Sequence, residues 1–330
     1  MKGDVIYEGK SLKKWFPAGA SFFGKTKDFV KAVDDVSLRV YQGETLGIVG
    51  ESGCGKSTLI RLMMGLLPLT EGKIFFEGQD ITHIHGDAKK VLRRNIQIVF
   101  QDPFAALNPR QKVGSMLAEA IDLGNEILLF SERKKEIARL LDMVGLPQDA
   151  ADKFPHEFSG GQRQRLCIAR ALAVKPKLLM CDECVSALDV SIQAQIINLL
   201  MKLQKEMGLT LIFVSHDLRV IRHIADHVAV MYLGKVVEYG KSEAIFTSPK
   251  HPYTKALLST IPVANPDAKR NPIVLKGDIP SPIHVPSGCP FHTRCWMAKE
   301  ACKEVSCPLT ECEALHMTAC PFYREMKEEN

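Results

Sequence analysis

Short apolar runs recur along the chain and predict buried strands. Each ends in a glycine, a proline or polar residues, as a strand does where it enters a turn. The runs lie at 43–50, 93–103, 177–183 and 209–217. Residues 32–40 alternate between apolar and polar side chains and predict a half-exposed strand, whereas residues 226–240 predict a hairpin with a Leu-Gly turn.

Apolar residues at helical spacing follow several of these runs. The predicted helices cover 56–67, most of 111–146, 157–174 and 191–208. The last helix ends at Gly208 and has one apolar face, which consists of Ile192, Ile196, Leu199, Leu200 and Leu203. Strands that alternate with helices in this way predict an α/β fold.

The composition changes near residue 246. Prolines recur from Pro249 to Pro286, which predicts a linker or extended arm leading into a cysteine-rich tail. We therefore expect a main domain over 1–246 and a C-terminal extension over 247–330.

The bulk composition is that of a soluble globular protein, with 330 residues, 46% hydrophobic and 25% charged. Lys and Arg exceed Asp and Glu by 43 − 38 = 5, an excess that suits a phosphate-binding or membrane-adjacent surface and equally an ordinary solvated one. No apolar run reaches the roughly 18–20 residues of a membrane-spanning helix. The first residues, Met-Lys-Gly-Asp, predict no secretory signal, so we expect the chain to stay in the cytosol and partners to bring it to a membrane.

Residues 50–57 match the phosphate-loop pattern G-x-x-x-x-G-K-[ST] between a predicted strand and a predicted helix. Glycines let main-chain N–H groups approach phosphate oxygens, and the helix directs its positive end at the same anion. Lys56 supplies a charge for the outer phosphates and Ser57 an oxygen for Mg²⁺. The alternative is a glycine-rich turn before a core helix. The expected ATP-binding residues are Gly50, Glu51, Ser52, Gly53, Cys54, Gly55, Lys56, Ser57 and Thr58.

Two acidic residues end the predicted strand at 177–183. Asp182 is placed to hold Mg²⁺ through water, and Glu183 to polarise the attacking water. An isolated acidic pair would indicate only the end of a strand. Together with a phosphate loop, this pair predicts ATP hydrolysis.

A second anion-binding helix start lies at Ser159, Gly160, Gly161 and Gln162. A chain with one phosphate loop has little need of another unless the second faces a different nucleotide. In this signature and over residues 30–245 the chain resembles the ATP-binding cassette family. The resemblance implies a head-to-tail dimer in which each ATP lies between the phosphate loop of one subunit and Ser159–Gln162 of the other.

The same resemblance implies roles for single residues. Gln101 is similar to the lid glutamine that contacts Mg²⁺ and water, and His216 to the switch histidine that contacts the γ-phosphate. Asp189, in the segment Ser186–Asp189, is similar to the loop that touches the opposite subunit. The implied fold is a P-loop α/β domain with an antiparallel β subdomain and a helical subdomain at about 103–175.

Two further positions follow from their place in the sequence, one upstream of the phosphate loop and one directly after the acidic pair. Phe16 is the aromatic residue expected to stack on adenine, with Trp15 as the alternative and a surface aromatic as the plain interpretation. Cys184 stands at a position where the branch of the family that the C-terminal segments resemble, named below, usually has proline. A small apolar role is expected for it, and a thiol close to the nucleotide is the alternative.

The C-terminal segments "SPKHPYTKALLSTIP" and "GDIPSPIHVPSGCPFHTRC" narrow the resemblance. They resemble the oligopeptide/dipeptide-uptake branch, specifically its F-type ATPase subunit. The resemblance implies an ATP hydrolase and translocase that powers peptide import, with uptake of nickel or another small solute as the alternative.

Six of the ten cysteines fall between Cys289 and Cys320, which in a reducing compartment predicts metal ligation rather than disulfides. By resemblance to the tails of peptide-transporter ATPases, a [4Fe–4S] cluster is expected; a zinc site and free thiols are the alternatives. Cys307 and Cys312 are expected to be bystanders. The expected cluster ligands are Cys289, Cys295, Cys302 and Cys320.

The resemblance also implies partners. These are a second, related ATPase subunit, two integral membrane permease subunits and an external solute-binding protein, with the chain peripheral at the cytoplasmic face of the membrane. A cassette ATPase acting on DNA or ribosomes is a rival, but such proteins carry coiled-coil insertions or two cassettes, so no nucleic acid is expected. An iron- or redox-sensing regulator is the other rival, and it would not need every hydrolytic residue.

Overall fold

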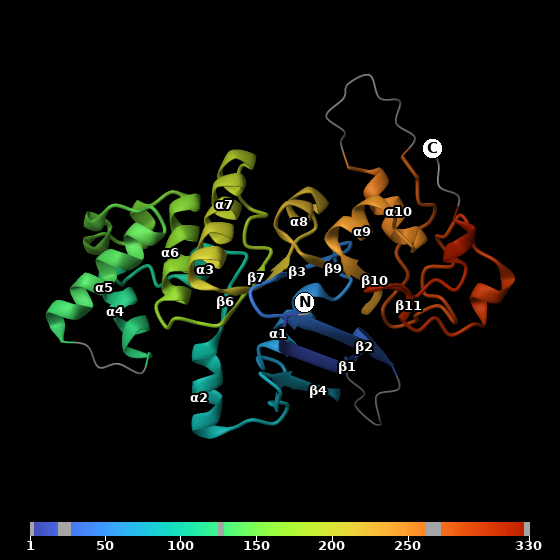
Figure 1. Ribbon diagram of the computed structural model, residues 1–330, viewed down its shortest axis with the longest axis horizontal. Coiled ribbons are helices and arrows are strands. Elements are labelled where there is room, and N and C mark those ends of the chain that lie inside the picture. The colour runs from blue at the N-terminus through green and yellow to red at the C-terminus, as the bar shows by residue number, and fades with distance from the viewer. Residues whose placement is uncertain (1–2, 19–27, 125–128, 262–271, 327–330) are drawn as a thin grey trace, which may run out of the picture. The chain divides into compact units, whose positions relative to one another are not determined.

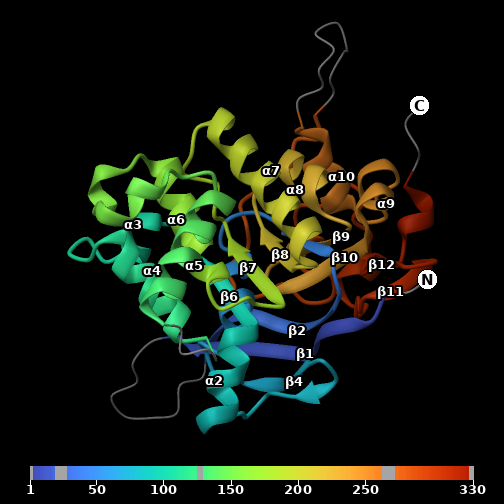
Figure 2. The ribbon, with the colours of Figure 1, turned by 60° about the vertical axis from the view of Figure 1, so that its left-hand side comes forward.

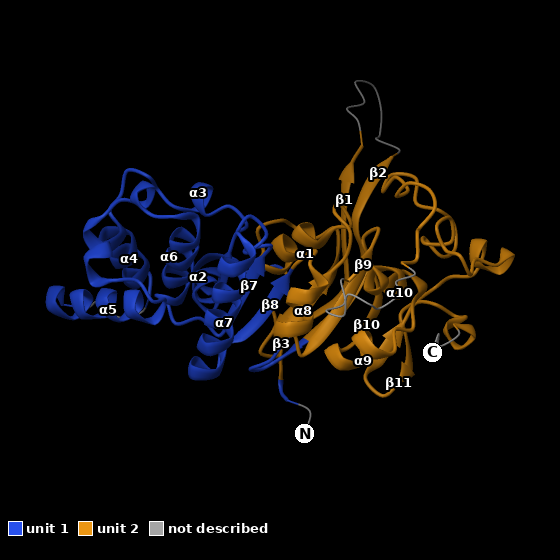
Figure 3. Ribbon diagram, turned by 90° about the horizontal axis from the view of Figure 1, so that it is seen from above, with its two compact units in different colours: residues 1–4, 40–45, 83–214 blue, residues 5–39, 46–82, 215–330 orange. Residues whose placement is uncertain are grey.

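The computed structural model describes residues 3–18, 28–124, 129–261 and 272–326. The chain divides into two compact units, each made of segments distant in sequence (Figure 3). Unit 1 comprises residues 1–4, 40–45 and 83–214, and unit 2 comprises residues 5–39, 46–82 and 215–330.

Unit 1 contains three parallel strands in the order β8-β7-β6, which are β8 (Thr210–Val214), β7 (Leu178–Asp182) and β6 (Ile96–Val99). All residues of β7 and β8 are buried, so the continuous apolar runs predicted as strands fill both faces of the sheet. Asp182 pairs with Val214 in register, which brings the carboxyl ends of the two strands to one edge.

The helices of unit 1 cover the predicted helical stretches. Helices α3 to α6 gather at one end of the unit (Figure 1). Helix α7 ends as expected at Gly208, whose φ of 64° is left-handed. The helices are α2 (Gly86–Asn95), α3 (Pro103–Ala106), α4 (Val113–Asp122), α5 (Phe130–Met143), α6 (Gly160–Leu172) and α7 (Val190–Met207), with 3-10 turns at Gln148–Asp152 and Pro155–Glu157.

Unit 2 contains an antiparallel sheet with the order β2-β1-β4-β5 (Figure 2). Its strands are β2 (Phe29–Tyr41), β1 (Val5–Pro17), β4 (Glu71–Phe76) and β5 (Gln79–Asp80). Residues 1–30 have no steady apolar period, which predicts only a strand end and a loop, whereas β1 runs for 13 residues. Part of that predicted loop, 19–27, lies outside the described residues.

A second set of strands in unit 2 has the order β11-β12-β10-β9-β3. Leu233 and Gly234 form the predicted turn between β9 and β10, with φ of 44° and 76°. The strands are β3 (Thr45–Val49), β9 (His227–Tyr232), β10 (Lys235–Lys241), β11 (Thr310–Glu313) and β12 (His316–Thr318). The helices are α1 (Lys56–Met63), α8 (Leu218–Ile224), α9 (Ser242–Thr247) and α10 (Pro252–Ser259), and short 3-10 turns lie at Glu300–Lys303 and Tyr323–Glu325.

The residues beyond 246 belong to unit 2. The prediction of an extended arm is wrong at α10, where Pro252 takes the first helical position and the His251 side chain accepts from the N–H of Tyr253. Residues 262–271 of the predicted arm lie outside the described residues. Within the described part of the chain, no helix combines the length and the apolar character needed to cross a membrane.

Candidate functional site

Unit 2 carries the phosphate loop between β3 and α1, as predicted. Gly50, Gly53 and Gly55 have φ of 155°, 79° and 105°, and a Cβ at Gly55 would lie 2.0 Å from the carbonyl oxygen of Ala32. The glycines are therefore required by the path of the backbone. Gly55 is the N-cap residue of α1 and provides no side-chain cap, so main-chain N–H groups of the first turn can bind an anionic ligand of the loop.

Lys56 lies inside the curve of the loop. Its side chain is buried, and Nζ donates to the carbonyl oxygens of Gly50 at 2.9 Å and Glu51 at 3.1 Å. An ammonium group held this way is oriented for anion binding, and phosphate oxygens would replace carbonyl oxygens as its acceptors. Ser57 and Thr58 follow in the first turn of α1.

Two buried thiols belong to these motifs in the sequence, Cys54 in the loop and Cys184 directly after the acidic pair. Burial raises the pKa of Cys54 within the loop, which keeps it protonated near neutral pH. A hydrogen bond with Cys181, and then burial, raise the pKa of Cys184, which is 1% exposed. Cys184 therefore occupies the small, apolar position that was expected for it.

Unit 1 carries the acidic pair. Asp182 is the last residue of β7 and is buried. Glu183 follows with φ of 48°, a left-handed backbone conformation that residues other than glycine rarely adopt. The Glu183 N–H donates to the carbonyl oxygen of Val214 at 3.1 Å. The backbone is thus fixed at the residue to which the attacking water was assigned.

The structure brings Gln101 next to this pair. Its Nε2 donates to Ser186 Oγ at 3.2 Å, and that hydroxyl donates to the carbonyl oxygen of Glu183 at 2.9 Å. The sequence had placed Gln101 and Ser186 in two separate segments. One chain of hydrogen bonds now connects the predicted lid glutamine to the predicted catalytic acid.

The signature segment forms the predicted helix start. Ser159 caps α6, since its Oγ accepts from the N–H of Gln162 and the Gln162 side chain accepts from the N–H of Ser159. A Cβ at Gly161 would lie 2.5 Å from Ile192 Cγ2, so the helix packs closely against α7 there. Ser159 is exposed, as a group that binds a second subunit's nucleotide would be. Asp189 is the N-cap residue of α7.

The remaining predicted residues lie in unit 2. His216 is exposed and follows Ser215, which is held by the carbonyl oxygen of Ile48 at 3.2 Å. Phe16 is half-buried, with Lys14 Nζ 5.1 Å from its ring centre. Trp15 donates from Nε1 to Asp34. Adenine stacking by either aromatic side chain stays a prediction.

The expected iron–sulfur site is not supported. Among the described residues, no group of three or more His, Cys, Asp or Glu side chains is placed to hold a metal ion. A hydrogen bond with Cys307 and contact with His251 lower the pKa of Cys289. Cys307, expected to be a bystander, is therefore the thiol that Cys289 contacts. The set Cys289, Cys295, Cys302 and Cys320 does not fit a cluster in this arrangement.

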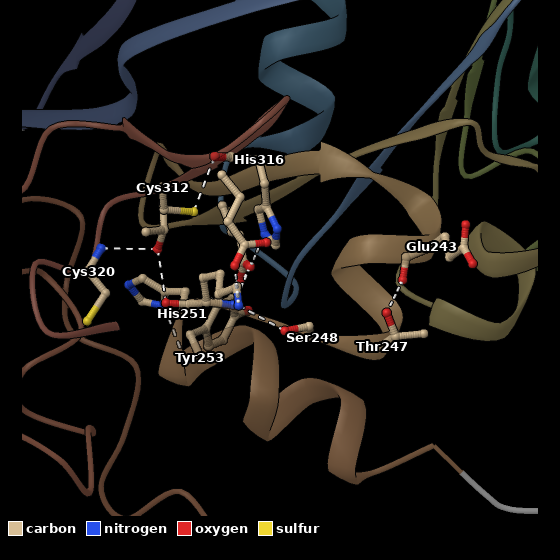
Figure 4. A network of polar contacts seen from close by, with 12 residues as sticks. Glu243, Thr247, Ser248, His251, Tyr253, Cys312, His316 and Cys320 are labelled. Atoms are coloured by element: carbon tan, nitrogen blue, oxygen red, sulfur yellow. Dashed lines mark hydrogen bonds and ion pairs between the residues drawn. The ribbon is translucent and has the colours of Figure 1, made fainter. Parts of the chain in front are cut away.

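The other expected bystander, Cys312, lies in one network of polar contacts with His251 and His316 (Figure 4). Glu238 is fully buried on β10 and accepts from the main-chain N–H of Lys250 and His251 and contacts His316 Nε2 at 2.7 Å. Cys312 Sγ donates to the carbonyl oxygen of His316. These contacts fix the tail to the sheet. They could not be predicted from the sequence, because no residue carries a local signal for its partner.

Comparison with known proteins adds the family. A model described as "ABC transporter" matches residues 33–186, and one described as "Oligopeptide/dipeptide transporter, C-terminal region" matches residues 237–302. The chain is 51% identical to the oligopeptide transport ATP-binding protein AppF of Bacillus subtilis, over 97% of this chain and 98% of the relative. It belongs to the ABC transporter family of ATP-binding proteins.

Other relatives agree with this assignment. The oligopeptide transport ATP-binding protein OppF of Salmonella typhimurium is 48% identical over 96% of both chains. Among solved structures, this ABC ATPase is similar to cbiO1 from Clostridium perfringens, part of the ABC transporter complex cbiONQ, with a TM-score of 0.63 and 30% identity over 74% of this chain and 91% of that one. It is also similar to the cassette MJ0796, whose dimer bound ADP and Pi, with a TM-score of 0.63 and 29% identity over 72% of this chain and 99% of that one. The expected α/β cassette fold is confirmed.

Proposed function

We propose that this chain is the ATP-hydrolysing subunit of a membrane importer for oligopeptides or dipeptides. The observation that carries the proposal is the joining of a preformed phosphate loop to a C-terminal region that matches peptide transporters. The relatives named for oligopeptide transport extend over nearly the whole chain, tail included. No feature of the described residues favours nickel or another small solute over peptides.

We assign the roles at the nucleotide site residue by residue. Lys56 and the loop N–H groups bind the phosphates, and Phe16 stacks on the adenine. Ser57 and Gln101 would provide oxygen ligands of the kind that Mg²⁺ prefers, Asp182 would hold the ion through water, and the ion would neutralise phosphate charge. Glu183 polarises the water that attacks the γ-phosphorus, ADP leaves with the bridging oxygen, and His216 contacts the γ-phosphate.

We also propose the assembly. Ser159–Gln162 face the ATP of a second, related ATPase subunit, and Asp189 contacts that subunit. Two permease subunits hold the chain at the cytoplasmic face of the membrane, and an external solute-binding protein delivers the peptide. We propose the domain division 1–246, with a helical part at about 103–175, and 247–330. A [4Fe–4S] cluster is not part of the proposal, because the described cysteines form no ligand group.

Replacing Glu183 by Gln tests the motor. The amide cannot accept the proton of the attacking water, so MgATP should still bind while turnover falls by at least about 100-fold. The measurement is ATP binding and phosphate release by the assembled transporter in proteoliposomes, together with uptake of a labelled tripeptide. Asp142→Asn on α5 changes an acid outside the site and should leave both unchanged.

Two results would contradict the proposal. Full turnover by Glu183→Gln would refute its role as the residue that polarises water. ATP-dependent accumulation of nickel without accumulation of peptide would refute the substrate class.

A further inference from the structure

An ion pair joins the cysteine-rich tail to the phosphate loop. Arg294 Nη1 and Nη2 lie 2.7 Å and 3.1 Å from the two carboxylate oxygens of Glu51, which is 243 positions away in the sequence. The Arg294 side chain is 8% exposed and that of Glu51 is 26% exposed. A two-point pair with this little solvent fixes the orientation of the carboxylate.

The main chain of the same residue is also held from outside the loop. The Glu51 N–H donates to the hydroxyl of Tyr253 on α10 at 2.9 Å. Burial raises the pKa of Tyr253, so it remains a neutral phenol that can accept this bond. Glu51 is therefore fixed at its backbone by α10 and at its side chain by the tail.

Aromatic packing fixes the two anchors to each other. Phe291, Tyr232 and Tyr253 are fully buried with ring centres 4.8–5.4 Å apart, and the N–H of Arg294 donates to the carbonyl oxygen of Phe291 at 3.0 Å. The tail turn that carries Arg294 is thus packed against the end of β9 and the start of α10. Such packing limits the positions that the guanidinium group can take.

The charge of Glu51 has a direct bearing on phosphate binding. Its carbonyl oxygen accepts from Lys56 Nζ, so it belongs to the curve in which the phosphates are expected to lie. A carboxylate there without a counter-charge would repel the nucleotide anion. Arg294 supplies that counter-charge from the tail.

We propose that Arg294 is a positioning residue of the nucleotide site, through which the C-terminal extension sets the affinity of the phosphate loop for ATP and ADP. This inference rests on the proposed function. It assigns to the extension a role in the ATP cycle, which the match of residues 237–302 with peptide transporters does not describe.

The test compares nucleotide affinity and turnover in the full chain assembled with its transporter. Arg294→Gln should raise the Kd for MgADP and the KM for MgATP by about fivefold or more, the range of ordinary coupling between two sites. Because Arg294 touches neither water nor phosphorus, kcat at saturating MgATP should change by less than about twofold. Arg294→Lys should recover part of the affinity, since it restores the charge without the two-point geometry.

A second substitution separates charge from simple damage. Adding Glu51→Gln to Arg294→Gln removes the unpaired carboxylate, so the double variant should bind MgADP more tightly than Arg294→Gln alone. A role limited to folding of the tail would give no such recovery. Tyr253→Phe, which leaves the tail intact and removes the acceptor of the Glu51 N–H, should also raise the Kd.

The matched control is Lys299→Gln, which breaks the ion pair with Glu325 in the same tail and should not alter nucleotide affinity. If Arg294→Gln binds MgADP as tightly as the unmodified chain, or if the double variant shows no recovery, the inference is overturned. If the unmodified chain neither binds nor hydrolyses MgATP, the proposed function fails instead.

Discussion

At the scale of single residues, Glu183 stands out because its backbone is left-handed, a conformation that is sterically unfavourable for a residue with a Cβ atom. The hydrogen bonds to Val214 and Ser186 hold that conformation. Strain that the surrounding contacts maintain is common at catalytic positions. The backbone at Glu183 is therefore fixed, and with it the direction in which the side chain leaves the main chain.

Tyr7 gives a residue-level prediction about stability and pH. It is fully buried on β1, donates to the carbonyl oxygen of Met63 at 2.6 Å, and burial raises its pKa well above the usual value. Its contribution is fully present below the unfolded pKa of about 10 and is lost as pH rises towards the folded pKa. Tyr7→Phe should therefore lower the free energy of unfolding by about 1 kcal/mol at pH 8. It should also make that free energy depend less on pH above about 10.

Urea unfolding followed by circular dichroism at pH 8 and at higher pH measures this effect. Tyr239→Phe is the control, because its hydroxyl donates to the carbonyl oxygen of Arg39 at an exposed position. The control should keep the pH dependence of the unmodified chain. An equal slope for Tyr7→Phe and the unmodified chain would contradict the prediction.

At the scale of elements, the attachment of β12 to β10 depends on Glu238. Glu238→Ala would leave two main-chain N–H groups and the His316 ring without their acceptor, each unpaired group costing about 1–3 kcal/mol. We expect β11 and β12 to detach and the tail to be cut faster by trypsin, measured as the rate of loss of the intact chain.

Glu313→Gln is the control for this prediction. It breaks the pair with Lys250 in the same tail, but the Glu313 side chain is 56% exposed, and exposed pairs contribute little. Protection of Glu238→Ala equal to that of the unmodified chain would show that the strands are held by something else.

Elements with a local signal were predictable from the sequence. The apolar runs at β3, β7 and β8 are buried on both faces, and the Leu-Gly pair predicted the β9–β10 turn. Glycine spacing likewise predicted the phosphate loop. The reason is that each of these depends on residues within about a dozen positions.

Contacts distant in sequence were not predictable. Nothing near Glu51 indicates Arg294, and nothing near Glu238 indicates His316, because tertiary packing alone brings them together. Cysteine spacing predicted a cluster but carries no information on the direction of each thiol. It therefore gave no indication that Cys289 forms a hydrogen bond with Cys307, which was expected to be a bystander.

At the scale of the whole molecule, the proposed assembly pairs this chain with a second ATPase subunit. In that assembly the signature helix start of this chain faces the nucleotide of the partner. Ser159→Phe should leave MgATP binding at this chain's own loop unchanged. It should abolish MgATP-dependent association with the second ATPase in the Glu183→Gln background, since the exposed helix start would be blocked. Sedimentation with and without MgATP measures this.

Ser131→Phe, at an exposed position of α5, makes the same change away from the signature and should permit association. Undiminished association of Ser159→Phe would show that the second nucleotide is not bound at this helix start.

The pairing of β12 with β10 has a consequence for how the chain folds while it is being synthesised. β10 ends at Lys241, whereas β12 begins at His316, 316 − 241 = 75 positions later. When a ribosome builds the chain from its N-terminus, β10 emerges with one side unpaired and stays so until β12 (His316–Thr318) has emerged. During that interval the strand is open to pairing with other nascent chains, so a ribosome stalled within the tail would release an aggregation-prone protein.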